Sequence, residues 1–315
     1  MNQQPARPSI AVVGSLNMDM VVRAPRRPAK GETLLGTGFG LFIGGKGNNQ
    51  AIAAARAGGQ VTMVGRVGAD SFGDALLAML AKEGIDARYV LRDPVHGTGV
   101  ALIVVDAEGD NSIIVVPQAN RALALDDIDR AAKSIAACDV LLLQLEIPLE
   151  VAARAAFVAR RAGRIVILNP APAQAVPRDL LAAVDILVPN EGEIAMLTGH
   201  KPDGVAAALE AARSLRATYT GLRTVIVTLG EHGALVISTE GETHVPAYPV
   251  KAVDTTAAGD AFCGALAVAL GRGEPLLEAV RYGNAAGALS VTVAGAEPSL
   301  PRDEAIERLR ATGHL

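Results

Sequence analysis

Short apolar runs alternate with longer Ala- and Leu-rich segments along most of this 315-residue chain. Runs such as Ile10–Gly14 (IAVVG) and Val140–Leu145 (VLLLQL) are typical of buried strands, and segments such as Asn48–Ala57 have helical spacing. Strands that alternate with helices form βαβ units, in which helices cover both faces of a mostly parallel sheet. The pattern therefore predicts an α/β fold. The other predicted strands are Val61–Val67, Ile165–Leu168, Ile186–Val188 and Val225–Leu229; the other predicted helices are Ser71–Lys82, Leu149–Ala162, Glu191–Thr198 and Val205–Ala217, and the chain from Asp254 onward is nearly all helical.

Two pairs of segments interrupt this alternation. Met18–Arg23 and Leu34–Ile43 resemble strands, but Pro and Gly residues separate them where a helix would be expected. Thr98–Val105 and Ser112–Pro117 flank a turn whose sequence, DAEGDN, is typical of a β-hairpin. We expect these strands, at about residues 18–43 and 98–117, to form a small sheet that acts as a lid on one large α/β domain spanning residues 1–315.

Composition excludes several classes of protein. The charge sum of 29 Lys and Arg minus 33 Asp and Glu is −4, so the chain lacks the basic excess of a dedicated nucleic-acid binder. No apolar stretch approaches the ~18 residues that a membrane-spanning helix needs. Cys138 and Cys263 lie in apolar runs, and the opening residues (MNQQPARPS) lack the apolar core of a secretion signal. We therefore expect a cytoplasmic protein that binds neither membranes nor nucleic acids.

Glycine is enriched, with 33 residues, and one cluster, Gly36–Gly47 (GTGFGLFIGGKG), leads into a predicted helix. The run GLFIGGK nearly matches a phosphate-binding P-loop, but the next residue is Gly47, where that loop needs Ser or Thr to hold magnesium. The segment also lacks the spacing of a dinucleotide-binding Rossmann motif. The cluster indicates either a turn that needs left-handed backbone or a loop that brings its backbone and the polar side chains at 46 and 48–50 close to a ligand.

A second cluster of small residues, Val253–Phe262 (VDTTAAGDAF), precedes a helix whose apolar face continues through Leu266. Small side chains leave the N–H groups at a helix N-terminus accessible, and these groups favour an anion. Asp260, in the first turn, either complements the helix dipole or acts as a base that activates a hydroxyl for attack on a phosphoryl group. The cluster is thus a candidate site of phosphoryl transfer.

These motifs occur together in a known family. The sequence resembles the ribokinase branch of the ribokinase/fructokinase carbohydrate kinases over essentially the whole chain. The resemblance rests on GGKGNNQA (44–51) and DTTAAGDAF (254–262), with NPAP (169–172), PNEGE (189–193) and TLG (228–230) between them. It implies a Rossmann-like three-layer αβα sandwich with a β-sheet lid, and ATP-dependent phosphorylation of D-ribose at the 5-hydroxyl to give D-ribose 5-phosphate.

The resemblance implies roles for individual residues in sugar binding and catalysis. Asp260 is the general base that takes the proton from the sugar's primary hydroxyl, and Ala257, Ala258 and Gly259 supply the backbone N–H groups of an anion hole, which ends at Asp260. The residues that bind sugar hydroxyls are Asn17 and Asp19 at the end of the first strand, Gly45, Lys46, Gly47, Asn48 and Asn49 of the glycine loop, Glu146, and Asp260 itself. From the residues alone, Asn17 and Asp19 could equally form a turn, and Glu146 could simply end a strand.

The resemblance also implies ATP, Mg²⁺ and an activating K⁺. Asn190 and Glu193, one helical turn apart, are linked to magnesium, and the carboxylate acts through water or directly. The residues implied for ATP are Asn190, Thr228, Leu229, Gly230, Glu231, His232, Gly233, Gly259, Asp260 and Asn284, and those implied for K⁺ are Asp254, Thr256, Ser290, Val293, Gly295 and Ser299. A homodimer through the lid sheet is implied as well, because lid strands outside the main sheet have exposed edges and one apolar face.

Residue 48 leaves the choice of sugar open. Ribokinases commonly have Ala where this chain has Asn48, which would either add a sugar contact or point outward. Asn17 favours a substrate with a hydroxyl over a deoxy sugar, because a buried polar group would otherwise lack a partner. The alternatives are a related kinase for deoxyribose, a ketose or a nucleoside, and a catalytically inactive sugar sensor. The intact Gly259–Asp260 and Asn190-x-x-Glu193 argue against the sensor.

Overall fold

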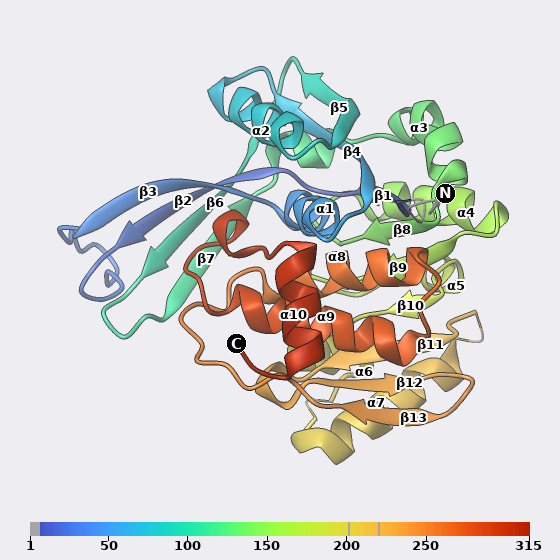
Figure 1. Ribbon diagram of the computed structural model, residues 1–315. Helices are drawn as coiled ribbons and strands as arrows, with labels where there is room; N and C mark the ends of the chain where they lie inside the picture. Colours follow the sequence, from blue (N-terminus) through green and yellow to red (C-terminus); the bar gives the residue numbers. More distant parts are fainter. Residues whose placement is uncertain (1–6, 201, 220) are drawn as a thin grey trace.

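The computed structural model describes residues 7–200, 202–219 and 221–315, so residues 1–6 of the polar opening segment lie outside the described residues. Within this part of the chain, a nine-stranded sheet runs through the centre of the molecule (Figure 1). Seven neighbouring strands are parallel, and the two remaining strands extend one edge through antiparallel pairings, which confirms the mostly parallel sheet. In spatial order the strands are β13 (Glu242–Val245), β12 (Ala234–Ile237), β11 (Thr224–Thr228), β10 (Ile186–Leu187), β9 (Ile165–Leu168), β8 (Val140–Leu143), β1 (Ser9–Val13), β4 (Gln60–Gly68) and β5 (Asp86–Asp93).

Helices cover both faces because successive side chains of a strand point to opposite sides. In β1, Ile10 and Val12 belong to one buried apolar cluster, whereas Ala11 and Val13 belong to the other. The first cluster is completed by α1 (Lys46–Arg56), α2 (Ser71–Lys82), α8 (Ala258–Gly271), α9 (Leu276–Ser290) and α10 (Asp303–Thr312). The second is completed by α3 (Leu125–Ala137), α4 (Leu149–Arg161), α5 (Arg178–Ala182), α6 (Glu191–Thr198) and α7 (Gly204–Thr218). These layers confirm the αβα sandwich.

Four further strands form a separate small sheet, here called the lid sheet, which projects to one side of the main sheet (Figure 1). In spatial order they are β3 (Gly38–Gly44), β2 (Asn17–Arg23), β6 (Gly99–Val105) and β7 (Asn111–Val116). β2 pairs in parallel with β6, and the other two pairs are antiparallel. The expected small sheet is thus present, although residues 34–37 precede β3 instead of belonging to it.

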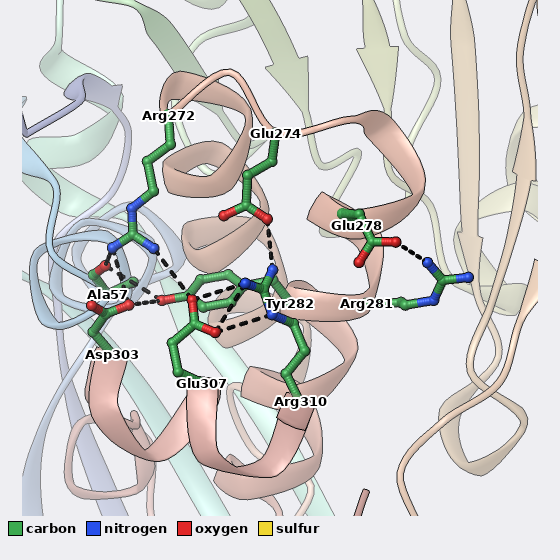
Figure 2. Close-up of polar contacts among 9 residues, drawn as sticks. All are labelled: Ala57, Arg272, Glu274, Glu278, Arg281, Tyr282, Asp303, Glu307 and Arg310. Atoms are coloured by element: carbon green, nitrogen blue, oxygen red, sulfur yellow. Dashed lines mark hydrogen bonds and ion pairs between the residues drawn. The ribbon is translucent and has the colours of Figure 1, made fainter. Parts of the chain in front are cut away.

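The C-terminal helix is attached through a buried tyrosine. Tyr282 of α9 lies between the guanidinium groups of Arg272 and Arg310, whose Cζ atoms are 5.5 and 5.3 Å from the ring centroid. Its hydroxyl donates to Asp303 of α10, and Arg272 donates to the carbonyl oxygen of Ala57 (2.7 Å) at the end of α1 (Figure 2). The cluster therefore fixes α10 to α9 and to α1. Among the described residues, no helix is both long and apolar enough to span a bilayer.

Candidate functional site

Polar residues, several of them selected from the sequence, converge at the carboxyl ends of the central parallel strands, where open α/β sheets bind ligands. Ser15 follows β1, Glu146 follows β8, Asn169 follows β9, and Asn190 follows β10. The helices α1 and α8 begin at the same edge, so Lys46 and Asp260 in their first turns lie close to these residues.

We expected Asn17 and Asp19 at the end of the first strand, and this expectation was wrong. Strand β1 ends at Val13, and the pair belongs to the beginning of the lid strand β2. The amide nitrogen of Asn17 is 3.5 Å from Glu146 Oε2, and the backbone N–H of Lys46 donates to the same oxygen at 3.2 Å. The lid, the glycine loop and the end of β8 therefore meet in one polar cluster.

Ser15, which the sequence analysis did not select, links two members of this cluster. Its hydroxyl donates to the Glu146 carboxylate and accepts from the backbone N–H of Gly47 at 3.3 Å. Gly47 packs so closely here that an added Cβ would lie 2.5 Å from the backbone nitrogen of Ser15. Gly45 has a positive φ of 90°, a backbone conformation that residues other than glycine rarely adopt. Both glycines are thus required by the shape of the loop.

Asp260 is almost completely buried in the first turn of α8. Its Oδ1 accepts from Gln50 Nε2 at 3.0 Å, and its Oδ2 accepts from Asn49 Nδ2 at 3.1 Å. Burial raises the pKa of Asp260, while Lys46 and the two amides oppose that rise. The amide nitrogen of Asn49, expected to bind sugar, is thus directed at the carboxylate.

Lys46 is the positive charge at the centre of this group of acids. Burial disfavours its ammonium, but Asp260, Glu146 and Glu193 outweigh burial and raise the pKa of Lys46. The pKa of Asp19 is also raised, but for a carboxyl this favours the neutral form. Burial, and then repulsion by Glu146 and Asp260, raises its pKa to about 7. The cluster therefore gathers more carboxylates than cations, and one carboxyl titrates near neutrality.

A cavity of about 170 Å³ adjoins Asp260 and is lined by Lys46, Asn190, Glu193 and the backbone of residues 257–260. Ala257 caps α8 in the left-handed conformation, with φ 62°, which costs an L-residue about 1–2 kcal/mol. The Ala258 N–H is already used in the turn, where it donates to Thr255 at 3.3 Å. The N–H groups in the first turn of a helix have no intrahelical acceptor. The cavity therefore has the character of an anion site.

Asn190 and Glu193 form a reciprocal capping box at the start of α6. Asn190 Oδ1 accepts from the Glu193 backbone N–H at 2.8 Å, and Glu193 Oε2 accepts from the Asn190 backbone N–H at 2.9 Å. The pair therefore has a structural role as a helix cap and also lines the cavity beside Asp260. Burial raises the pKa of Glu193, against the effects of the Asn190 N–H and Lys46.

A larger cavity of about 940 Å³ continues from the first. Thr228, Gly230–Gly233 and Asn284 line it as expected, whereas the side chain of Leu229 lies in the apolar core. The amide nitrogen of Asn284 donates to the carbonyl oxygens of Val245 (3.2 Å) and Pro246 (3.1 Å), so its Oδ1 is the atom that can accept from a ligand. The sequence analysis missed the walls formed by residues 247–250 and Phe262.

Asp254 organises the loop implied for K⁺. Its Oδ1 accepts from Thr256 N (2.9 Å) and Thr256 Oγ1 (2.6 Å), and its Oδ2 accepts from Gly295 N (2.9 Å). Burial favours a higher pKa for Asp254, but these hydrogen bonds outweigh it and lower the pKa. Ser290 and Ser299 are buried and donate to carbonyl oxygens three residues earlier in the chain. Val293 is 45% exposed and its side chain carries no oxygen, so only its carbonyl could serve a cation.

Asn48 does not point outward, because its side chain is completely buried. Within the described part of the chain, neither its Nδ2 nor its Oδ1 has a hydrogen-bond partner. It also lines neither of the two cavities. A direct sugar contact through Asn48 therefore has no support in the geometry.

Comparison with known proteins identifies the family. Residues 7–303 match the pfkB family carbohydrate kinases. The chain belongs to the pfkB family of carbohydrate kinases. It is 40% identical to the ribokinase of Haemophilus influenzae, over 96% of this chain and 99% of that protein, and 40% identical to the deoxyribokinase of Salmonella typhi, over 94% and 96%. The structure of Arabidopsis thaliana ribokinase complexed with ribose and ATP matches this carbohydrate kinase with a TM-score of 0.90 and 33% identity, over 97% and 99% of the two chains.

Proposed function

We propose that this carbohydrate kinase transfers the γ-phosphate of ATP to the 5-hydroxyl of D-ribose, which gives ADP and D-ribose 5-phosphate. The observation that carries the proposal is the position of Asp260, which lines the cavity at the N-terminus of α8 and lies near the polar cluster that includes Asp19 and Glu146. The names of the relatives, and the ribose and ATP bound to the Arabidopsis protein, support the same reaction.

In this mechanism the sugar's primary hydroxyl faces Asp260, which removes its proton as the oxygen attacks the γ-phosphorus. The proton moves to the carboxylate, the new oxygen–phosphorus bond forms, and the bond to the ADP oxygen breaks. Negative charge spreads over the transferring group, and the N–H groups of the first turn of α8 together with Lys46 stabilise it. Closure of the lid sheet over the sugar would exclude water and suppress hydrolysis of ATP.

The residues present fit both metal ions of the proposal. Glu193 has lone pairs free beyond its cap contacts, and a carboxylate beside the phosphate cavity suits Mg²⁺ held through water. Mg²⁺ neutralises phosphate charge when bound. The loop at Asp254, Thr256 and Gly295, with the hydroxyls of Ser290 and Ser299, offers oxygen donors of the kind that K⁺ takes.

The test is a coupled assay of ADP release over D-ribose, 2-deoxy-D-ribose, ketoses and nucleosides, with and without Mg²⁺ and K⁺. We expect the highest kcat/KM with ribose, complete dependence on Mg²⁺ and stimulation by K⁺. Asp260→Ala should lower kcat by about 10²–10⁴-fold, the usual contribution of a general base. A variant that turns over at the normal rate would refute the base assignment.

Deoxyribose is the second candidate, because the Salmonella relative named a deoxyribokinase is as similar as the ribokinases. The orientation of Asn17 favours ribose. Its Oδ1 accepts from Asn120 Nδ2 at 2.7 Å, and one N–H of its amide nitrogen is directed at Glu146 Oε2 at 3.5 Å, which leaves the second N–H as a donor for a sugar hydroxyl. A buried donor without a partner weakens binding of the analogue that lacks the hydroxyl. A higher kcat/KM with 2-deoxyribose than with ribose would select the alternative.

We also propose a cytosolic homodimer that joins through the lid sheet. Both cysteines, Cys138 and Cys263, are buried free thiols, which suits a reducing compartment. Large apolar side chains are exposed on the lid sheet, and so many together favour a covered surface. On one face these are Phe39, Leu41, Leu102, Ile114 and Val116, and on the other Phe42, Ile113 and Val115.

A further inference from the structure

We propose that Gln50 is a positioning residue that orients the Asp260 carboxylate and joins it to the Asn169–Glu193 arm of the site. The inference rests on the proposed function, since it takes Asp260 as the base. Gln50 lies one helical turn after Lys46 in α1, so the two side chains share a face of the helix. It is completely buried, and it lines neither cavity, so it acts through its neighbours.

The chemistry of Asp260 fixes which way the Gln50 amide points. An ionised carboxylate can only accept hydrogen bonds, so the Gln50 nitrogen must face Asp260 Oδ1, at 3.0 Å. The Gln50 oxygen then needs a donor, which Gln144 supplies from the end of β8 with an Nε2 to Oε1 distance of 2.6 Å. A reversed Gln50 amide would place its oxygen against the carboxylate oxygen. Gln144 therefore locks Gln50 as a donor to the base.

The second N–H of the same Gln50 nitrogen faces Asn169 Oδ1 at 3.2 Å. Because Asn169 accepts there, its nitrogen is the donor on the other side, to Val188 O at 3.0 Å and Glu193 Oε2 at 3.4 Å. Hydrogen bonds thus run in one direction from Gln144 through Gln50 and Asn169 to Glu193, with a branch to Asp260. One buried nitrogen serves both the base and the carboxylate proposed for magnesium.

This arrangement holds the carboxylate of Asp260 without adding charge. Gln50 binds Oδ1 and Asn49 binds Oδ2, so the plane of the carboxylate is fixed and its remaining lone pairs are left for the sugar hydroxyl. The charged and titratable groups that face Asp260 from the surrounding elements are Lys46 of α1, Glu146 after β8, Glu193 of α6, Asp19 of the lid sheet and Cys263 of α8. Among so many acids, neutral donors keep Asp260 ionised without perturbing Lys46.

Replacing Gln50 with Met keeps the length of the side chain and removes its hydrogen bonds. We expect kcat to fall about 10- to 100-fold while the KM values for sugar and ATP change less than about threefold, because the base is misaligned but the binding groups remain. The acid limb of the kcat profile should move to higher pH, since burial then acts on Asp260 with one donor fewer. The control is Gln60→Met, an exposed glutamine of β4, which should match the parent enzyme.

A second variant, Gln144→Met, tests the hydrogen bond from Gln144 that orients the Gln50 amide. It also keeps the experiment interpretable if Gln50→Met folds poorly. It should lower kcat by less than Gln50→Met, and the double variant should be no worse than Gln50→Met alone, because both act on one hydrogen-bonded chain. Gln50→Met or Gln144→Met with parental kcat and an unmoved acid limb would overturn the inference. The inference would also be overturned if the losses of kcat in the two single variants added up in the double variant and simply followed the losses in melting temperature.

Asp260→Asn separates this inference from the proposed function. If Asp260→Asn is inactive while folded Gln50→Met behaves as the parent, only the role of Gln50 fails. If Asp260→Asn turns over normally, the base assignment fails, and the role of Gln50 fails with it.

Discussion

At the scale of single residues, the site concentrates charge that the fold would be more stable without. Lys46 is surrounded by the carboxylates of Asp260, Glu146 and Glu193, with Asp19 nearby. Burial raises the pKa of Asp260 above its ordinary value, so the ionised carboxylate is less favourable in the folded chain than in the unfolded one. Such a group contributes stability at low pH and loses it as the pH rises and the carboxyl ionises. The proposed base is therefore maintained at a cost in stability.

Asp260→Asn should consequently raise stability while it abolishes transfer. The neutral amide is nearly isosteric and relieves both burial and repulsion from Glu146, and these gains outweigh the loss of one of the two oxygens that accept from Gln50 and Asn49. We expect a gain on the order of 1 kcal/mol in the free energy of unfolding at pH 8, measured by urea denaturation. Asp110→Asn, in the exposed β6–β7 turn, should leave stability unchanged. A destabilised Asp260→Asn protein would show that the charge of Asp260 favours the fold.

Because of Asp19, we expect both the stability of the protein and its KM for sugar to depend on pH near neutrality. Its pKa is about 7 when folded, above the ordinary value of 3.8, so its contribution to stability is complete below about pH 4 and lost as the pH rises through 7. The melting temperature of Asp19→Asn should therefore fall less than that of the parent between pH 6 and 8. The KM for sugar should rise in the parent below pH 7, because the ionised carboxylate is the better acceptor for hydroxyls. Parallel melting curves for the two proteins would contradict the assignment.

Asn48 and Asn120 make a matched pair for the energetics of buried amides. Both are buried, but Asn48 has no hydrogen-bond partner in the described chain, whereas Asn120 bonds to the backbone of Leu16 and to Asn17. An unpaired buried polar group costs about 1–3 kcal/mol. Thermal melting should therefore show Asn48→Ala to be more stable than the parent and Asn120→Ala to be less stable. A loss of stability in Asn48→Ala would mean that its amide is satisfied by bound water.

At the scale of elements, the contact between α1 and α8 sets the geometry of the site. A Cβ added at Gly264 would lie 2.5 Å from the Cβ of Ala53 and 2.9 Å from the carbonyl oxygen of Gln50. Gly264→Ala should push the helices apart, cost about 1–3 kcal/mol, and lower kcat because Asn49 and Gln50 then lose Asp260. Gly287→Ala in α9, whose nearest neighbour would be 3.4 Å away, should not be destabilised in the same melting experiment. Equal stability of the two variants would refute this account.

The sequence predicted the central elements better than the edges. Buried parallel strands such as β8 appear as continuous apolar runs, and so β8 and β9 were located correctly. The strands β5 (DARYVLRD) and β13 (ETHV) lie at the two edges of the main sheet and carry charges, so neither showed that pattern. The amphipathic α3 was also missed. A continuous apolar run indicates a strand that is buried on both faces, and the two edge strands are less buried than the central ones.

The site divides in a similar way. Motifs located Asp260, Lys46 and the Asn190–Glu193 pair, because each lies in a short segment with a distinctive composition. Gln144, Asn169 and Asn120 became visible as partners only in three dimensions. Gln144 and Asn169 bond to Gln50 across 94 and 119 positions, and Asn120 bonds to Asn17 across 103. No local pattern encodes a contact of that separation. The unpaired state of Asn48 is likewise a property of packing.

At the scale of the whole molecule, the lid sheet should determine the oligomeric state. Replacing Ile113 and Ile114 together with Glu puts a charge on each face of β7, where both side chains are now exposed. We expect the double variant to be a monomer and the parent a dimer by light scattering. Leu125→Glu, an exposed apolar position of α3, should remain dimeric. A parent protein that is monomeric at all concentrations would reject the dimer.

The pairing of α1 with α8 has a consequence for biosynthesis. Gln50 and Asp260 are 210 positions apart, and at ~5–20 residues per second the ribosome needs about 10–40 s to synthesise the chain between them. During that interval the apolar side of β1, including Ile10 and Val12, has none of its α8 neighbours. The nascent enzyme therefore exposes an incomplete, aggregation-prone surface until its last fifth, which contains α8, emerges. Its proposed catalytic centre can form only then.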